Sequence, residues 1–76
     1  MANKKDNNAV YKIIEIVGTS TVSFADASKN AVKVASKSLR DLRVAEVDKL
    51  DLKIDSSGKV TFRAKLKVSF KYHGED

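Results

Sequence analysis

Apolar and polar residues alternate without a break over residues 60–72, near the end of the printed sequence. Only a β-strand places every second side chain on one face, so this segment is predicted to be a strand of thirteen residues. The polar face carries four basic residues, Arg63, Lys65, Lys67 and Lys71. That face must meet solvent, a ligand or another subunit. The apolar face consists of Val60, Phe62, Ala64, Leu66, Val68, Phe70 and Tyr72.

Two earlier segments also have the composition of strands. Residues 10–17 are rich in β-branched side chains and carry apolar residues on both faces, and they precede Gly18. We therefore predict a strand over these residues, followed by a loop over residues 18–22. Residues 42–55 are predicted to form another strand, in which the parity of the apolar positions changes near Asp48. A β-bulge at that point restores one consistent apolar face.

Residues 23–40 have the pattern of a helix. Ser23 is a favourable N-cap residue, and Asp26, three residues later, is its expected reciprocal capping partner. Apolar residues recur at helical spacing up to the predicted end near Leu39 or Arg40. Because most of these apolar residues are alanines, we expect the helix to lie close to its sheet.

The order of the elements predicts an α+β fold of β-α-β-β type. Residues 55–59 contain Gly58 and are predicted to form a hairpin loop between the last two strands. A right-handed crossover through the helix makes the first two strands parallel to each other. The last strand fits between them and runs antiparallel to both. The prediction is a three-stranded antiparallel sheet of order 1-3-2, packed on one helix.

The chain has 76 residues, and we expect one domain over residues 10–73, between a disordered polar tail at residues 1–9 and a C-terminal tail at residues 74–76. A chain this short buries only about 60% of its unfolded surface and usually needs a disulfide, a metal or a partner chain. The sequence has no cysteine. One helix also cannot cover both apolar faces of residues 10–17. We therefore expect a homo-oligomer.

The formal net charge is +5, with 15 basic and 10 acidic residues. Lys29, Lys33, Lys37 and Arg40 form a basic stripe along the outer face of the predicted helix. A small nucleic-acid-binding module is therefore an alternative function. No aromatic platform and no RNA-binding signature accompany the stripe, so a solvated helix face is the simpler interpretation.

Several classes of protein find no support in the sequence. There is one histidine and no grouping of nucleophile, base and orienting acid, so we do not expect an enzyme. No apolar run approaches the ~20 residues of a membrane helix. No hydrophobic segment follows the N-terminal lysines as it does in a signal peptide. With cysteine also absent, we expect a cytoplasmic protein without a membrane partner.

Four acidic residues lie along the second predicted strand and its loop: Glu46, Asp48, Asp51 and Asp55. Carboxylates are the ligands that calcium prefers, but calcium takes six to eight oxygens. One chain does not obviously provide so many, whereas several copies that meet at a symmetry axis could. These residues are our candidate metal ligands, and solvated or salt-bridged acids are the alternative.

Three segments, in order and at matching spacing, resemble the dodecin family: residues 10–20 (VYKIIEIVGTS), residues 31–47 (AVKVASKSLRDLRVAEV) and residues 65–70 (KLKVSF). The resemblance implies a β-α-β-β protomer that assembles into a hollow homododecamer. It also implies a non-enzymatic protein that binds flavin, such as FMN or riboflavin, for storage or protection. On this basis Val44, Glu46, Arg63 and Lys65 are the candidate cofactor-binding residues.

Two positions depart from the flavin-binding pattern of that family. Val44 stands where the pattern has a Trp that stacks on the flavin ring, and stacking contributes around 1 kcal/mol beyond burial. Arg63 stands where some members have a Gln, and Arg offers donors but no acceptor. A subgroup described as calcium dodecins is similar to this chain at both positions. The resemblance therefore implies an impaired flavin site and adds calcium as a ligand.

Overall fold

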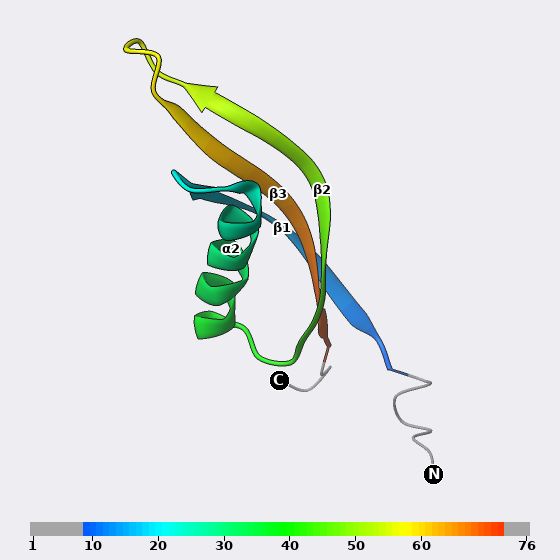
Figure 1. Cartoon of the computed structure of the whole chain (residues 1–76). Coiled ribbons are helices and arrows are strands. Elements are labelled where there is room, and N and C mark those ends of the chain that lie inside the picture. Colours follow the sequence, from blue (N-terminus) through cyan, green and yellow to red (C-terminus); the bar gives the residue numbers. More distant parts are fainter. Residues whose placement is uncertain (1–8, 73–76) are drawn as a thin grey trace.

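The computed structural model describes residues 9–72 and contains the four predicted elements in the predicted order. These are the strand β1 (Tyr11–Ser20), the helix α2 (Phe24–Ser38), and the strands β2 (Leu42–Ile54) and β3 (Val60–Lys71). The three strands form one sheet of order β1-β3-β2, and β3 pairs antiparallel with both neighbours (Figure 1). The predicted α+β fold and strand order are therefore confirmed.

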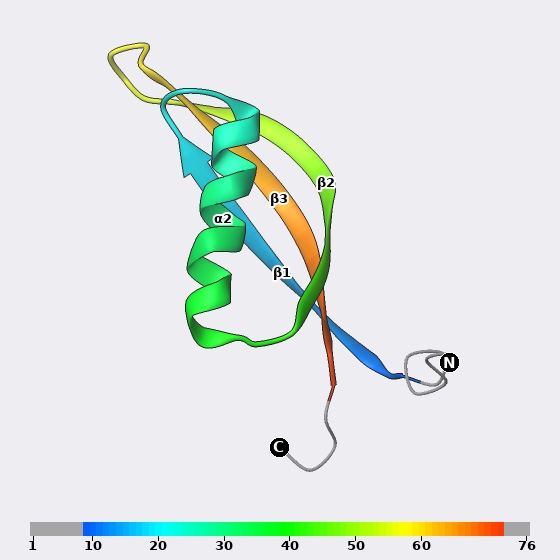
Figure 2. The same cartoon turned by 60° about the horizontal axis from the view of Figure 1, so that its bottom comes forward.

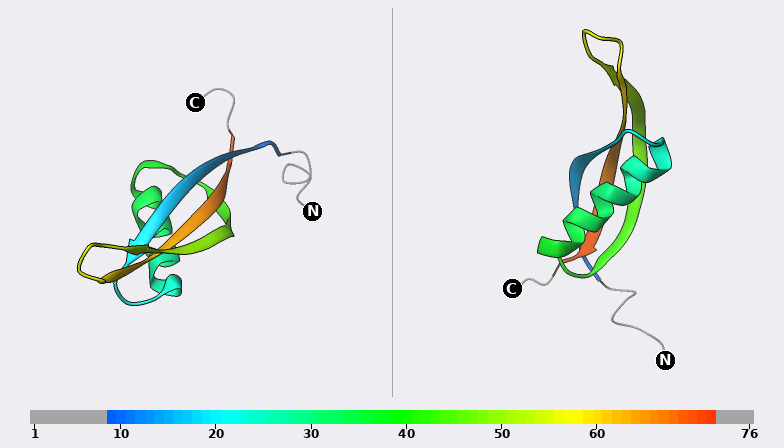
Figure 3. Two further views of the ribbon diagram at one scale, coloured as in Figure 1. Left: turned by 90° about the horizontal axis from the view of Figure 1, so that it is seen from above. Right: turned by 60° about the vertical axis from the view of Figure 1, so that its left-hand side comes forward.

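The core lies between α2 and the central strand β3. The helix covers one face of the sheet, and among residues 9–72 no helix lies on the other face (Figure 3). Ala27 and Ala31 on the helix pack against Ala64, Leu66 and Val68 on β3, and all five are buried. Small helix residues let the two backbones approach closely, as the alanine-rich pattern predicted.

The end of β1 differs from the prediction. Residues 18–20 belong to the strand, so the loop predicted for residues 18–22 is wrong over its first three residues. Position 18 requires a glycine because α2 crosses the strand at that point and leaves no room for a side chain. A Cβ on Gly18 would collide with the carbonyl oxygen of Ala27 and lie 2.8 Å from the Cβ of Ala31. The glycine therefore marks a close approach of the helix and not a strand end.

The start of α2 uses the predicted N-cap but not the predicted reciprocal contact. The backbone amide of Asp26 donates to the Ser23 hydroxyl at 2.9 Å. The Asp26 carboxylate accepts from the hydroxyl of Ser20 at 2.6 Å, and the Ser23 amide donates to that same hydroxyl at 3.4 Å. The hydroxyl of Ser20 thus stands between the two residues of the expected capping pair. The helix ends at Ser38, with Leu39 as its C-cap.

The long β2–β3 hairpin contains the predicted bulge. The register with β3 shifts between Val47 and Lys49, which confirms the bulge at Asp48, and shifts once more between Leu42 and Val44. The second shift was not predicted. The strand β2 ends at Ile54, one residue before its predicted end.

The predicted loop joins β2 to β3. The Asp55 carboxylate accepts hydrogen bonds from the backbone amides of Ser57 and Lys59 and from the Ser57 hydroxyl, at 2.7–2.9 Å. Gly58 has a φ of 87°, a conformation that favours glycine. These contacts fix a tight loop at the tip of the hairpin.

The hairpin extends well past the N-terminal end of α2 (Figures 1 and 2). The principal extents of the molecule are 55 × 21 × 14 Å, so it is a long, thin body. We call the projecting part, residues 53–60, the arm. Within the described residues, no helix is long and apolar enough to cross a membrane. The tails predicted at residues 1–9 and 74–76 lie outside the described residues, apart from Ala9.

Candidate functional site

The helix-free face of the sheet carries all four candidate cofactor-binding residues. The strand register places them in cross-strand rows, because directly paired residues share a face. The central column comes from β3 and is mostly basic, whereas the outer columns from β1 and β2 are mostly acidic and apolar, with Lys49 and Thr19 as the exceptions. From the arm downwards, the rows are Thr19–Arg63–Asp51, Val17–Lys65–Lys49, Glu15–Lys67–Glu46 and Ile13–Ser69–Val44.

Arg63 and Lys65 line one end of this face. The Arg63 guanidinium donates to both carboxylate oxygens of Asp51, at 2.7 and 2.8 Å. This bidentate hydrogen bond lowers the pKa of Asp51 and raises the pKa of Arg63. With Lys49 and Val17, these residues surround a shallow hollow of about 330 Å³. The hollow has three cationic side chains and one anionic side chain, so it favours an anionic group.

Val44 and Glu46 lie at the other end of the face. Val44 is paired with Ser69, six residues along β3 from Arg63, which is roughly 20 Å at about 3.3 Å per residue. The side chain of Val44 is 61% exposed. One protomer therefore does not bring Val44 and Arg63 together, and a ligand that contacts both would have to lie between two copies.

The four candidate metal ligands do not form a cluster within one protomer. Among residues 9–72, no three side chains of His, Cys, Asp or Glu lie close enough together to hold a metal ion. Asp51 is held by Arg63, and Asp55 accepts hydrogen bonds from its own loop, which lower its pKa. Within the described part of the chain, Glu46 and Asp48 make no hydrogen bond or ion pair, so their carboxylates are available to a ligand.

Three side chains of this face were not among the sequence candidates. Lys49 and Val17 line the hollow beside Arg63, and Glu15 approaches Lys65 at 3.5 Å between its Oε1 and the lysine Nζ. Their position depends on the register between strands, which includes a bulge in β2. The alternation in residues 10–17 does place Glu15 and Val17 on one face of a strand. It does not say which residues of β3 lie beside them.

The basic stripe of the helix faces solvent. Lys29, Lys33 and Lys37 are all exposed in the structure, whereas Arg40, predicted to continue the stripe, lies beyond the end of α2. Neither Phe nor Tyr lies between them, so bases of a nucleic acid would find no aromatic ring along the stripe. The stripe is an electrostatic surface without a platform for stacking.

Comparison with known proteins agrees with this fold. The family model described as Dodecin matches residues 10–73. Calcium dodecin from Mycobacterium tuberculosis is 51% identical over 63 residues, which are 83% of this chain and 89% of that protein. Its crystal structure, described as that of a calcium-chelating immunodominant antigen with a calcium-binding site, has a TM-score of 0.80 and is 48% identical, covering 88% of this chain and 96% of that one.

A second solved structure supports the same assignment. Dodecin from Streptomyces coelicolor has a TM-score of 0.80 and is 36% identical, and the match covers 87% of this chain and 94% of that chain. Both relatives are matched over nearly their full length, and the family model spans most of the sequence. This chain therefore belongs to the dodecin family.

Proposed function

We propose that this protein is a non-enzymatic small-ligand-binding and storage protein that works as a hollow homododecamer, with calcium as its principal ligand. The observation that carries the proposal is the pair of carboxylates at Glu46 and Asp48, which lie on the edge strand β2 and have no partner among residues 9–72. Identity of 51% to a protein named calcium dodecin supports the choice of ion.

The calcium site requires more than one copy of the chain. Calcium takes six to eight oxygens, and each protomer offers two available carboxylates on this strand. We propose that Glu46 and Asp48 from neighbouring copies converge on the ion. Asp51 and Asp55 remain candidates of second rank, because Arg63 and the hairpin loop already use their oxygens. Calcium binding and assembly should therefore depend on each other.

Flavin is proposed as a weak ligand only. Val44 offers no aromatic ring to stack on a flavin, and its partner Ser69 is small. Arg63 keeps two of its N–H groups on Asp51, so a ring ligand would have to compete with that ion pair. Lys65 and Glu46 can add charge beside such a ligand but no stacking surface.

Calorimetric titration of the purified protein with CaCl₂ tests the principal ligand. We expect saturable binding that weakens at least tenfold in both Glu46→Gln and Asp48→Asn. Glu15→Gln is the matched control, because Glu15 lies on the same face and is not a candidate ligand, and its calcium affinity should stay within about threefold of the original. Absence of saturable binding, or equal affinity in all three variants, contradicts the proposal.

The proposed weak binding of flavin is tested by introducing an aromatic ring at position 44. Val44→Trp should tighten FMN binding by about 1 kcal/mol, or roughly fivefold, as followed by quenching of FMN fluorescence. Val44→Leu adds apolar area without a ring and should produce a smaller gain. Tight, saturable quenching by the unmodified protein would contradict the proposed weakness of its flavin site.

Binding of nucleic acid through the helix lysines is the alternative function, favoured by the exposure of Lys29, Lys33 and Lys37. It predicts retention of RNA or DNA that falls steeply as salt is raised. The proposed storage function predicts no such retention at physiological salt. The cytoplasmic location expected from the sequence stays a prediction.

A further inference from the structure

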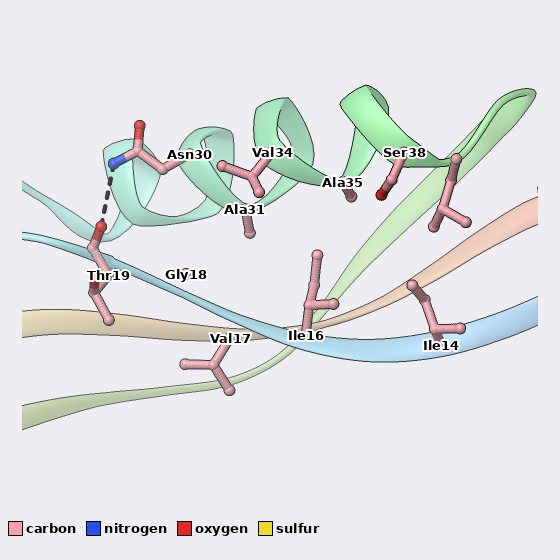
Figure 4. Close-up of a pocket in the computed structure, with 11 residues that line it drawn as sticks. Ile14, Ile16, Val17, Gly18, Thr19, Asn30, Ala31, Val34, Ala35 and Ser38 are labelled. Carbon is pink, nitrogen blue, oxygen red and sulfur yellow. Dashed lines mark hydrogen bonds between the residues drawn. The ribbon is translucent and has the colours of Figure 1, made fainter.

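The shallow hollow on the helix-free face carries a surplus of positive charge within one chain. Its volume is about 330 Å³, and it is lined by Val17, Lys49, Asp51, Arg63 and Lys65. Val17 contributes to it because this side chain points away from α2, whereas Ile16 on the same strand points toward the helix (Figure 4). All five lining residues come from one protomer, so the hollow does not depend on a second copy.

Two lysines lie directly opposite each other in this hollow. Lys49 on β2 is the cross-strand partner of Lys65 on β3. The Cβ atoms of such a pair lie about 4.5–5.5 Å apart, and like charges at these positions destabilise a sheet. The register shift between Val47 and Lys49 creates the pair, since a regular strand would place Asp48 opposite Lys65. The bulge therefore replaces an attractive pair by a repulsive one, which a bound anion would relieve.

The cationic side chains of the hollow keep hydrogen-bond donors in reserve. The Arg63 guanidinium is held by Asp51 through its Nε and Nη2 atoms, and its Nη1 atom makes no hydrogen bond within residues 9–72. Lys49 makes neither a hydrogen bond nor an ion pair in this part of the chain. Lys65 has one acidic neighbour, Glu15, at 3.5 Å. Even with Glu15 counted beside Asp51, three cations stand against two carboxylates.

We propose that this hollow is a binding site for a phosphate group, taken up as inorganic phosphate. Arg and Lys offer donors and no acceptor, so the ligand has to be rich in acceptor atoms. Charge-assisted hydrogen bonds from such donors to phosphate oxygens are among the strong ones. A phosphate group carries more than one negative charge at neutral pH, and its oxygens point in several directions. It can therefore bind donors that converge from two strands, whereas the two oxygens of a carboxylate lie in one plane.

The inference goes beyond the proposed calcium site and does not rest on it. The carboxylates proposed for calcium, Glu46 and Asp48, do not line the hollow. Phosphate binding can therefore be measured on protein from which calcium has been removed. Saturable phosphate binding by a protein that fails to bind calcium would leave this inference standing and remove the proposed ligand.

Calorimetric titration with sodium phosphate, on protein freed of calcium with a chelating resin, tests the site. We expect saturable binding that weakens at least fivefold in Lys49→Gln. Lys53→Gln is the matched control, because Lys53 lies on the same strand and face, opposite Thr61 and outside the hollow. Its phosphate affinity should stay within about twofold of the original. Absence of saturable binding overturns the proposal, and so does an equal loss in both variants, which would show attraction by the overall positive charge.

Thermal unfolding provides a second test that does not depend on the heat of binding. Lys49→Glu turns the repulsive pair into an attractive one, so without phosphate this variant should unfold at a higher temperature than the unmodified protein. Phosphate should raise the unfolding temperature of the unmodified protein and of Lys53→Gln, but not that of Lys49→Glu. An equal rise in all three proteins would be a general effect of the salt on folding and would contradict a phosphate site.

A phosphate ester distinguishes the free ion from a phosphorylated ligand. Glycerol 3-phosphate carries the same group on a small neutral body. Competition with inorganic phosphate in the unmodified protein, lost in Lys49→Gln, would confirm a phosphate site that also admits esters. Binding of inorganic phosphate without such competition would confirm a site for the free ion. Displacement of phosphate by glycerol alone would show that the phosphate group is not what is recognised, and would refute the assignment.

Discussion

Replacing Gly18 with alanine tests the close contact of α2 with β1. This contact holds Ala27 and Ala31 in the core. An alanine Cβ would collide with the carbonyl oxygen of Ala27 and lie 2.8 Å from the Ala31 Cβ, whereas ordinary contacts begin at 3.4 Å. Relief of the Ala31 contact alone needs about 0.6 Å, and the nearer Ala27 oxygen forces the helix outward by more than that. Such a shift loosens the packing of Ala27 and Ala31 against the sheet.

The expected loss of stability depends on whether the atom that blocks the new Cβ can move aside. Overpacking a core costs about 1–3 kcal/mol, and it is least costly where a flexible side chain can turn aside. Here the nearest atom is a backbone oxygen within a helix, so we expect the upper end for Gly18→Ala, about 3 kcal/mol. This is roughly a hundredfold change in the unfolding equilibrium constant.

Urea unfolding, followed by circular dichroism at one fixed protomer concentration, measures this loss, because the stability of an oligomer depends on concentration. Thr19→Ala is the neighbouring control and should change the free energy of unfolding by less than about 0.5 kcal/mol. Adding Ala31→Gly to Gly18→Ala should rescue stability in part at most, since the Ala27 carbonyl remains. A Gly18→Ala protein as stable as the original would refute the reasoning.

Three further changes test other contacts. Ser20→Ala removes a buried hydroxyl that accepts from the Val22 amide and donates to the Asp26 carboxylate, and should cost about 1–3 kcal/mol in urea unfolding. Asp55→Ala should speed hydrogen exchange of the loop amides, observed by NMR, without changing the particle mass. Because Arg63 lowers the pKa of Asp51 in the folded state, this pair stabilises the protein above the ordinary value of 3.8 and loses that effect as pH falls through the lowered pKa. Asp51→Asn should therefore flatten the loss of stability between pH 5 and pH 3, and an unchanged acid profile would contradict this assignment.

The fold could be predicted from sequence because its strongest signals are periodic. Residues 60–72 alternate strictly, and a change of parity within residues 42–55 was enough to predict the bulge at Asp48. Gly18 was misread because a glycine that ends a strand and a glycine that admits a helix look alike in sequence. The difference lies in the position of Ala27 and Ala31 above the strand, which no local pattern encodes.

The candidate site could be predicted only in part. Alternation correctly placed Arg63 and Lys65 on the helix-free face. It could not pair them with Asp51 and Glu15, because those pairs depend on the register of two neighbouring strands. The resemblance to the dodecins grouped Val44 with Arg63, which the structure places at opposite ends of one protomer. Whether they meet across two copies depends on the assembly, which the sequence of one chain does not specify.

We expect identical copies of this small domain to close around its exposed apolar surfaces. Sedimentation velocity at micromolar protomer concentration, combined with native mass spectrometry, tests it most directly. Twelve copies of an 8.4 kDa chain predict a single particle of about 100 kDa. A well-folded species of 8.4 kDa under the same conditions would contradict the account.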